Sequence, residues 1–227
     1  MDQEVVGAVK AVAPHPFNSD LVYVGTVNGG VWRTTNATSA RPTWDQLTDA
    51  APIGALEFDP IDPTHVTLVA GTGRFSSLLR AGGSLIGVLR TTDSGITWTT
   101  HNPGGLFTAF HICDVASRGN TIVVASNSVG GGIFRATSAG LPAEMWTQVS
   151  GAPGSGLPAG VSFALAGDPT LARFSHLYAH SGTNGIFKST DTGGTWSKVS
   201  TAAMDALIAT SANVKISVGV RENVYVA

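Results

Sequence analysis

The amino-acid sequence predicts an all-β chain. Charged residues make up only 12% of it, and its 227 residues include 28 glycines, a composition that suits short strands joined by tight turns. Four similar segments carry a tryptophan at intervals of 54, 48 and 50 residues: Trp44, Trp98, Trp146 and Trp196. Repeats of this length with four strands each are typical of β-propeller blades. We therefore expect a β-propeller of four-stranded antiparallel blades, with four near-complete blades and the start of a fifth.

Each repeat contains the same four segments in the same order. The first is an apolar stretch such as IGALEFDP, and the second is a short hydrophobic run such as LVYVGT or VTLVAGT. The third usually starts with glycine, as in GGVWRTT and NGIFKSTD, and the fourth starts at the tryptophan, as in TWSKVS. We expect four strands per blade in one domain spanning 1–227, with blades at about 5–49, 50–103, 104–151 and 152–201 and a partial blade at 202–227.

Turn residues predict how these strands connect. Asn28-Gly29 and Asn184-Gly185 favour tight type I′ turns, which would pair the second and third strands of the first and fourth blades antiparallel. His15, Asp59 and Asp168 occupy one recurring place after the first strand, so we interpret them as caps of a corner.

The turn before the fourth strand is acidic and glycine-rich in two repeats, TTDSGITWTT and STDTGGTWSK. A carboxylate there can accept several backbone N–H bonds, the glycine adopts a conformation closed to other residues, and the tryptophan covers the loop. A calcium site is a poorer interpretation, because each turn supplies one carboxylate. We therefore assign a structural role to Asp93, Gly95, Thr97, Trp98, Asp191, Gly193, Thr195 and Trp196.

The pattern Ser/Thr-x-Asp-x-Gly-x-Thr-Trp resembles the Asp-box of the bacterial-neuraminidase-repeat superfamily. The match is good at 91–98 and 189–196, and weak at the copies ending in Trp44 and Trp146. That superfamily contains sialidases, xyloglucanase-type glycoside hydrolases, sortilin-type receptors and photosystem assembly factors. The resemblance implies a propeller whose boxes are structural and lie away from the active face.

The resemblance also bears on activity. Sialidases carry an arginine triad and a tyrosine nucleophile, but here Tyr23, Tyr178 and Tyr225 occupy repeated strand positions and no Arg-Ile-Pro segment is present. The segment VYVGTVNGGVWRTT is more similar to the first blade of xyloglucanase-type enzymes, whose catalytic Asp follows the threonine. Val27 stands at that place. The resemblance therefore implies that at least one catalytic acid of that enzyme type is missing from this sequence.

The strongest departure from the repeat is a long loop in the second blade, GTGRFSSLLRAGGSLIG. Long loops on a rigid scaffold tend to carry contacts, and Arg74, Phe75 and Arg80 combine an aromatic surface with donors suited to a sugar, a carboxylate or a protein. The alternative is that Phe75 and its apolar neighbours pack the loop onto a blade. His180, at the end of a second strand, is a further binding candidate or a merely exposed side chain.

Two acids on first strands, Glu57 and Asp114, are expected to face the central channel. A pair of carboxylates is the minimum for glycoside hydrolysis, although an acid satisfied by neighbouring backbone is the commoner case. There is no G-x-S-x-G nucleophile motif, and the histidines show no metal-ligand spacing, so we expect no metal and no cofactor. The single Cys113 lies in an apolar run and is expected to be a small buried hydrophobe.

Charge and hydropathy exclude some classes of partner. The net charge is −2 without a basic cluster, which argues against nucleic acid, and no apolar run reaches the length of a membrane span. No signal peptide is visible, and we expect an extracellular or cell-surface protein that is a portion of a longer propeller, with open blade edges that other chains or further sequence would cover.

The main hypothesis is a non-catalytic recognition module that binds a glycan or a protein through its loop face. The alternatives are a fragment of a carbohydrate-active glycoside hydrolase whose remaining catalytic residues lie outside this sequence, and a structural or assembly-factor propeller.

Overall fold

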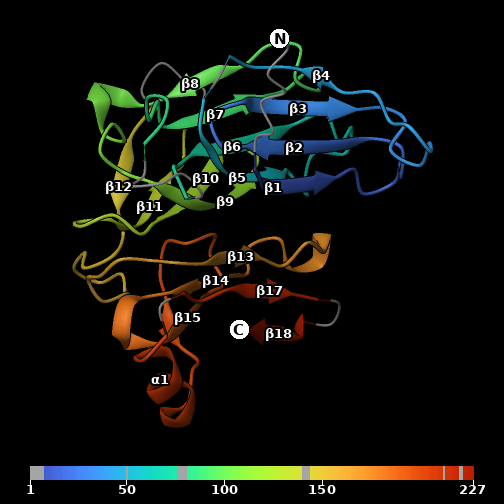
Figure 1. Ribbon diagram of the computed structural model, residues 1–227. Coiled ribbons are helices and arrows are strands. Elements are labelled where there is room, and N and C mark those ends of the chain that lie inside the picture. Colours follow the sequence, from blue (N-terminus) through green and yellow to red (C-terminus); the bar gives the residue numbers. More distant parts are fainter. Residues whose placement is uncertain (1–7, 50, 76–80, 140–143, 212, 220–221) are drawn as a thin grey trace.

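The computed structural model describes the chain except residues 1–7, 50, 76–80, 140–143, 212 and 220–221. Four antiparallel sheets of four strands follow one another along the chain, and a two-stranded sheet comes last (Figure 1). Within each four-stranded sheet the strands pair in sequence order. This arrangement confirms the prediction of an all-β chain built from propeller blades.

The strands of the first two sheets are β1 (Val9–Pro14), β2 (Val22–Thr26), β3 (Gly30–Thr34), β4 (Asp45–Gln46), β5 (Ile53–Phe58), β6 (Leu68–Thr72), β7 (Val88–Thr91) and β8 (Thr99–His101). Those of the next two are β9 (Ile112–Arg118), β10 (Thr121–Ser126), β11 (Gly132–Ala136), β12 (Trp146–Gln148), β13 (Leu165–Gly167), β14 (Leu177–His180), β15 (Ile186–Ser189) and β16 (Ser197–Lys198). The helix α1 (Ala202–Ile208) then precedes β17 (Ile216–Val218) and β18 (Val224–Val226).

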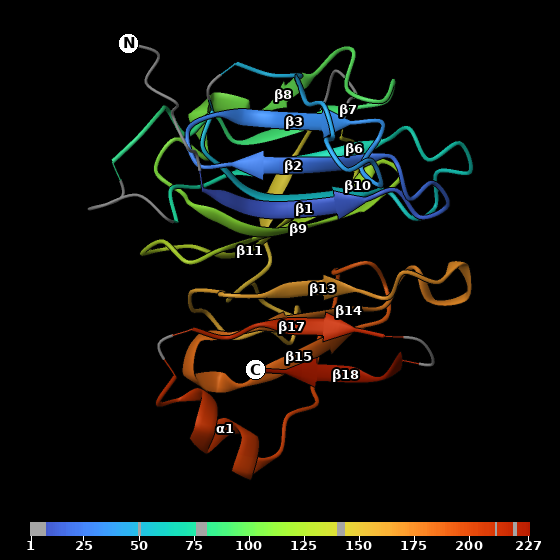
Figure 2. The same cartoon turned by 45° about the vertical axis from the view of Figure 1, so that its right-hand side comes forward.

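The first strands of the sheets lie next to one another and line a channel. β5 contacts both β1 and β9, and β13 contacts both β9 and β17. β1 and β17 point the same way in Figure 2, whereas β18 points the opposite way. The long loop between β6 and β7 emerges where Thr72 pairs with Ile53, the first residue of β5. We call this end of the channel, where the first strands begin, the loop end, and the opposite end the corner end.

The hydrophobic core lies between neighbouring sheets. Ile53 of the second sheet packs so closely on β2 that a Cβ atom at Gly25 would lie 2.3 Å from its Cγ2. Ile112 of the third sheet meets Gly71 of β6 at the same distance. Both isoleucines are fully buried, and each contributes roughly 2–3 kcal/mol by leaving water. The glycines in VGT and AGT therefore let one sheet approach the next.

The acidic turns are held by their own carboxylates. Asp93 Oδ1 accepts the N–H of Thr97 at 2.9 Å and the hydroxyl of Thr91 at 2.7 Å, while Oδ2 accepts the Thr97 hydroxyl at 2.6 Å. These bonds, first of all that from the Thr97 hydroxyl, lower the pKa of Asp93 to about 2. Asp191 is bonded in the same way by Ser189 and Thr195. Each carboxylate thus stabilises the turn in which it lies.

The corners after the first strands share one contact. His15 Nδ1 accepts the N–H of Phe17 at 3.2 Å, Asp59 Oδ1 that of Ile61 at 3.0 Å, and Asp168 Oδ1 that of Thr170 at 2.9 Å. In every case the acceptor bonds to the backbone two residues ahead, as in an Asx-type turn.

Two details differ from the sequence-based expectations. β2 pairs with β3, and β14 with β15, as expected, but neither connection is a type I′ turn. In the first connection the positive φ angles occur at Asn28 and Gly30. In the second, a short 3-10 turn at Gly182–Asn184 precedes Gly185. The stretch expected to hold only strands also forms α1, because it is rich in helix-forming Ala, Met and Leu and Thr201 caps it by accepting the N–H of Met204.

Candidate functional site

The described part of the β6–β7 loop is anchored to two other sheets. The backbone N–H of Arg74 donates to His111 Nδ1 at 2.9 Å, and Arg74 Nε donates to the carbonyl of Gly83 at 2.8 Å. The N–H of Gly83 in turn donates to Asn28 Oδ1 at 3.0 Å. The Arg74 guanidinium therefore helps to hold its own loop through its Nε–H. Arg80 lies outside the described residues.

Phe75 is half-buried and contacts the loop end of the channel. Its ring lies over glycine backbone, since a Cβ atom at Gly54 or Gly73 would come within 2.6 or 2.2 Å of it. The ring centroid is 5.9 Å from that of His111, and the ammonium of Lys10 lies 5.3 Å from it. Phe75 thus packs onto the neighbouring blade, as the structural alternative requires, and also borders a cationic group at the channel mouth.

His180 is buried, contrary to the alternative that it is merely exposed. Only 2% of its surface is accessible, its Nδ1 accepts the N–H of Phe163 at 3.3 Å, and the two rings are 5.4 Å apart. Burial lowers the pKa of His180, which favours the neutral imidazole. These contacts involve Phe163 and do not place His180 beside Arg74 or Phe75.

Glu57 and Asp114 both line one cavity in the channel, with a volume of about 420 Å³. Glu57 accepts the N–H of Ser117 at 2.8 Å and lies 3.3 Å from Arg118 Nη1. The Arg118 side chain is fully buried. Burial raises the pKa of Glu57, and Arg118 opposes that rise. Glu57 is therefore an acid satisfied by its neighbours.

Asp114 has weaker partners. Its Oδ2 accepts the N–H of Leu165 at 3.1 Å and lies 4.0 Å from Lys215 Nζ. Burial raises the pKa of Asp114 to about 6, against the opposing effects of Lys215 and the Leu165 bond. A carboxyl group that titrates near neutrality can act as a general acid. The cavity thus offers one carboxyl without an arginine partner, whereas glycoside hydrolysis ordinarily needs two.

Sequence reasoning did not single out Lys10 and Lys215, which line the same cavity. Each stands in or beside a short strand with no motif around it, so only the alternation of side chains along the strand could have placed it on the channel face. The described residues contain no group of three or more His, Cys, Asp or Glu side chains suited to a metal ion.

A second cavity, of about 640 Å³, opens at the corner end. Its lining is mainly apolar, and the exposed ring of Phe17 lies 4.8 Å from that of His65. No sequence pattern pointed to this cavity, because its walls come from corners of three different sheets.

No family model matches the sequence. The chain is 28% identical to a xyloglucanase from a Paenibacillus species in an alignment of 201 residues. The match covers 85% of this chain and 14% of that protein. Across the part of the chain that the structure describes, no helix is both long and apolar enough to cross a membrane.

Solved structures resemble the fold at low sequence identity. A GH74 enzyme of Niastella koreensis matches with a TM-score of 0.56 and 19% identity over 83% of this chain and 29% of its own. The GH74 xyloglucanase of Xanthomonas campestris matches with a TM-score of 0.57 and 14% identity, over 82% of this chain and 29% of its own. Sqt1 of Chaetomium thermophilum matches with a TM-score of 0.55 and 16% identity, over 97% of this chain and 55% of its own. At such identities these likenesses establish propeller-type architecture and nothing about activity.

Proposed function

We propose that this chain is a portion of a carbohydrate-active glycoside hydrolase of the xyloglucanase type, and that its loop end binds a polysaccharide. The observation that carries the proposal is the 28% identity to a xyloglucanase across 85% of the chain. The acidic turns support membership of the bacterial-neuraminidase-repeat superfamily, because their hydrogen bonds give the acids a structural role. We expect a hydrolase of polysaccharides to act outside the cell.

Within this portion the role is recognition. Val27 stands where the resembling enzymes carry a catalytic Asp, Glu57 is neutralised by Arg118, and Asp114 has no second free carboxylate beside it among the described residues lining the cavity. Catalysis would need acids from sequence beyond these 227 residues. The proposal therefore unites the hydrolase alternative with the non-catalytic recognition hypothesis.

The loop end supplies the chemistry that a polysaccharide needs. Phe75 offers part of a ring face for the C–H groups of a sugar, and Arg74 offers N–H donors that its bond to Gly83 leaves unused. Arg80 belongs to the same loop, and a protein partner is the alternative ligand for these residues.

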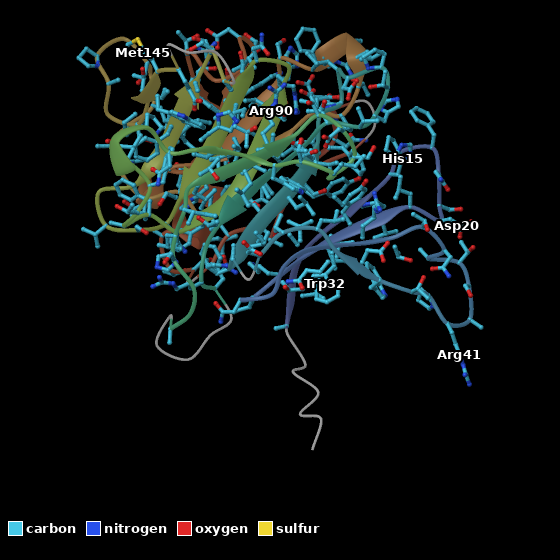
Figure 3. The ribbon with its side chains drawn as sticks, turned by 90° about the horizontal axis from the view of Figure 1, so that it is seen from above. His15, Asp20, Trp32, Arg41, Arg90 and Met145 are labelled. Carbon is cyan, nitrogen blue, oxygen red and sulfur yellow. The ribbon has the colours of Figure 1, made fainter. Side chains whose placement is uncertain are left out.

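Affinity electrophoresis tests the proposal. The chain should migrate more slowly in a gel that contains xyloglucan than in a gel without polysaccharide, and it should release no new reducing ends. The variant R74A should lose most of the retardation. R41A is the matched control, because Arg41 projects into solvent from the connection between β3 and β4 (Figure 3).

Normal migration in xyloglucan and in other β-glucans would contradict the proposal. Release of reducing ends by the chain itself, abolished in D114N, would instead assign catalysis to this portion and overturn its recognition role.

A further inference from the structure

Three charged side chains meet at the loop end of the channel. Lys10 is the second residue of β1, Asp114 the third of β9, and Lys215 directly precedes β17. All three line the cavity of about 420 Å³. Because the first strands all begin at the loop end, these charges surround the channel mouth on the side from which the long loop emerges.

Positive charge exceeds negative charge at this mouth once the Glu57–Arg118 pair, which lies toward the corner end of the channel, is set aside. Arg118 offsets Glu57 at 3.3 Å, and Lys215 approaches Asp114 at 4.0 Å. No described carboxylate lies within 4.0 Å of the Lys10 ammonium. The centroid of the Phe75 ring is 5.3 Å from it, and the Asp114 carboxylate attracts it from farther away. The cavity is lined by two lysines and two acids, and Arg118 behind its wall offsets Glu57. Among the described residues, the mouth itself therefore has two ammonium groups, Lys10 and Lys215, for one carboxylate, Asp114.

An ammonium group that is partly withdrawn from water without a close counter-ion is energetically unfavourable. Burial, and then repulsion by Lys215, lower the pKa of Lys10, and attraction by Asp114 opposes them only in part. A bound anion would relieve both effects. The surplus of a single charge, with the Asp114 carboxylate nearby, suits a monoanion such as a carboxylate better than a doubly charged phosphate.

The surroundings of the two ammonium groups suit a sugar that carries the carboxylate. Asp114 can accept hydrogen bonds from sugar hydroxyls, and the Phe75 ring beside Lys10 provides an apolar surface for a pyranose. We infer that the channel mouth formed by Lys10, Lys215 and Asp114 binds the carboxylate of an acidic sugar unit, a uronic acid, within the polysaccharide. This inference rests on the proposed function and names one chemical feature of its ligand.

A matched pair of ligands tests it. One is a β-glucan oligosaccharide ending in glucuronic acid, and the other is the same oligosaccharide with that carboxyl reduced to the alcohol. Titration calorimetry of the chain at pH 7.5 and low salt should give about tenfold tighter binding of the acid, the gain expected from charge-assisted hydrogen bonds, and added salt should reduce the difference.

Variants locate the contact. K10M and K215M should each remove most of the tenfold preference, whereas K10R, which keeps the positive charge, should retain it. K198M is the control, because Lys198 is paired with Asp205 at 2.6 Å in the outer strand β16. D114N should strengthen binding of the acid, since it removes a negative charge while its side-chain oxygen still accepts the Leu165 N–H. A gain in affinity cannot result from misfolding.

Equal affinity for the two oligosaccharides, or equal behaviour of K10M and K198M, would overturn the inference and leave the proposed function intact. Failure to bind either oligosaccharide or any β-glucan would overturn the proposed function and this inference with it.

Discussion

Replacing Asp114 by Asn should stabilise the protein at alkaline pH. Burial raises the pKa of this carboxyl from 3.8 to about 6, which corresponds to a cost of about 3 kcal/mol for keeping it ionised in the folded state. The pKa of Asp114 is higher in the folded state than in the unfolded state. The free energy of unfolding is therefore at its full value below pH 3.8 and falls as the pH rises through 6. Linkage gives a loss of about 1 kcal/mol at pH 4.5 and about 3 kcal/mol at pH 8.

Urea unfolding at pH 8 and pH 4.5 measures the effect. The variant D114N should exceed the natural chain by up to about 3 kcal/mol at pH 8 and by about 1 kcal/mol at pH 4.5. These are upper values, because 28% of the Asp114 side chain is exposed. D205N is a control of opposite sign, since Lys198 and then Ser200 lower the pKa of Asp205. If D114N raised the free energy of unfolding by the same amount at both pH values, or lowered it at pH 8, Asp114 would not be a buried carboxylate that is costly to ionise.

Three further perturbations have definite expected outcomes. The variant R118L should lose about 3–5 kcal/mol in urea unfolding because it leaves the Glu57 carboxylate unpaired, and E57L/R118L should recover part of that loss. D191A should cost about 1–2 kcal/mol, as loss of a cap does, whereas D191N should cost less, because Asn36 already accepts the equivalent bonds in the first sheet; equal losses would contradict this. The Cys113 thiol, buried and with its pKa raised mainly by that burial, should resist Ellman's reagent until urea unfolds the chain, and rapid reaction of the native protein would show otherwise.

The repeating elements were predictable because each depends on residues close together in the sequence. The tryptophan-ended segments, the glycine-led strands and the acidic turns are all local patterns, and they suffice to predict the antiparallel sheets. The first turn extends this reasoning. Asn36 replaces the acid there, yet its Oδ1 accepts the N–H of Thr43 at 2.9 Å and the hydroxyl of Thr34 at 2.9 Å. The turn needs an acceptor at this place and tolerates the loss of charge.

The side chains that line the channel together could not be predicted from the sequence, because their arrangement depends on how separate sheets meet. Glu57 was recognisable as an acid on a first strand, but its neutralisation by Arg118 joins two sheets across 61 residues of sequence. Lys10 and Lys215 reach the same cavity from opposite ends of the chain. His180 appears polar in the sequence, yet packing against Phe163 buries it.

A basic residue at one position of the third strand links each four-stranded sheet to the next. The contacts are Arg33 Nη1 to Ser94 O at 3.2 Å, Arg90 Nη2 to Gly119 O at 3.3 Å, Arg135 Nε to Thr192 O at 2.8 Å, and Lys188 Nζ to Glu222 Oε1 at 2.5 Å. Single blades cannot bury their apolar faces alone, so such contacts fix the order in which they stack.

Two of these acceptors explain what the acidic turns contribute beyond their own stability. Ser94 and Thr192 follow Asp93 and Asp191 directly and have positive φ angles of 60° and 59°. Asp93 bonds to Thr91 and Thr97 on either side of Ser94, so it holds the turn in which the Ser94 carbonyl faces the preceding sheet. That carbonyl accepts from Tyr23 as well as from Arg33. Loss of Asp93 should therefore weaken the contact between the first and second sheets, in addition to loosening the turn itself.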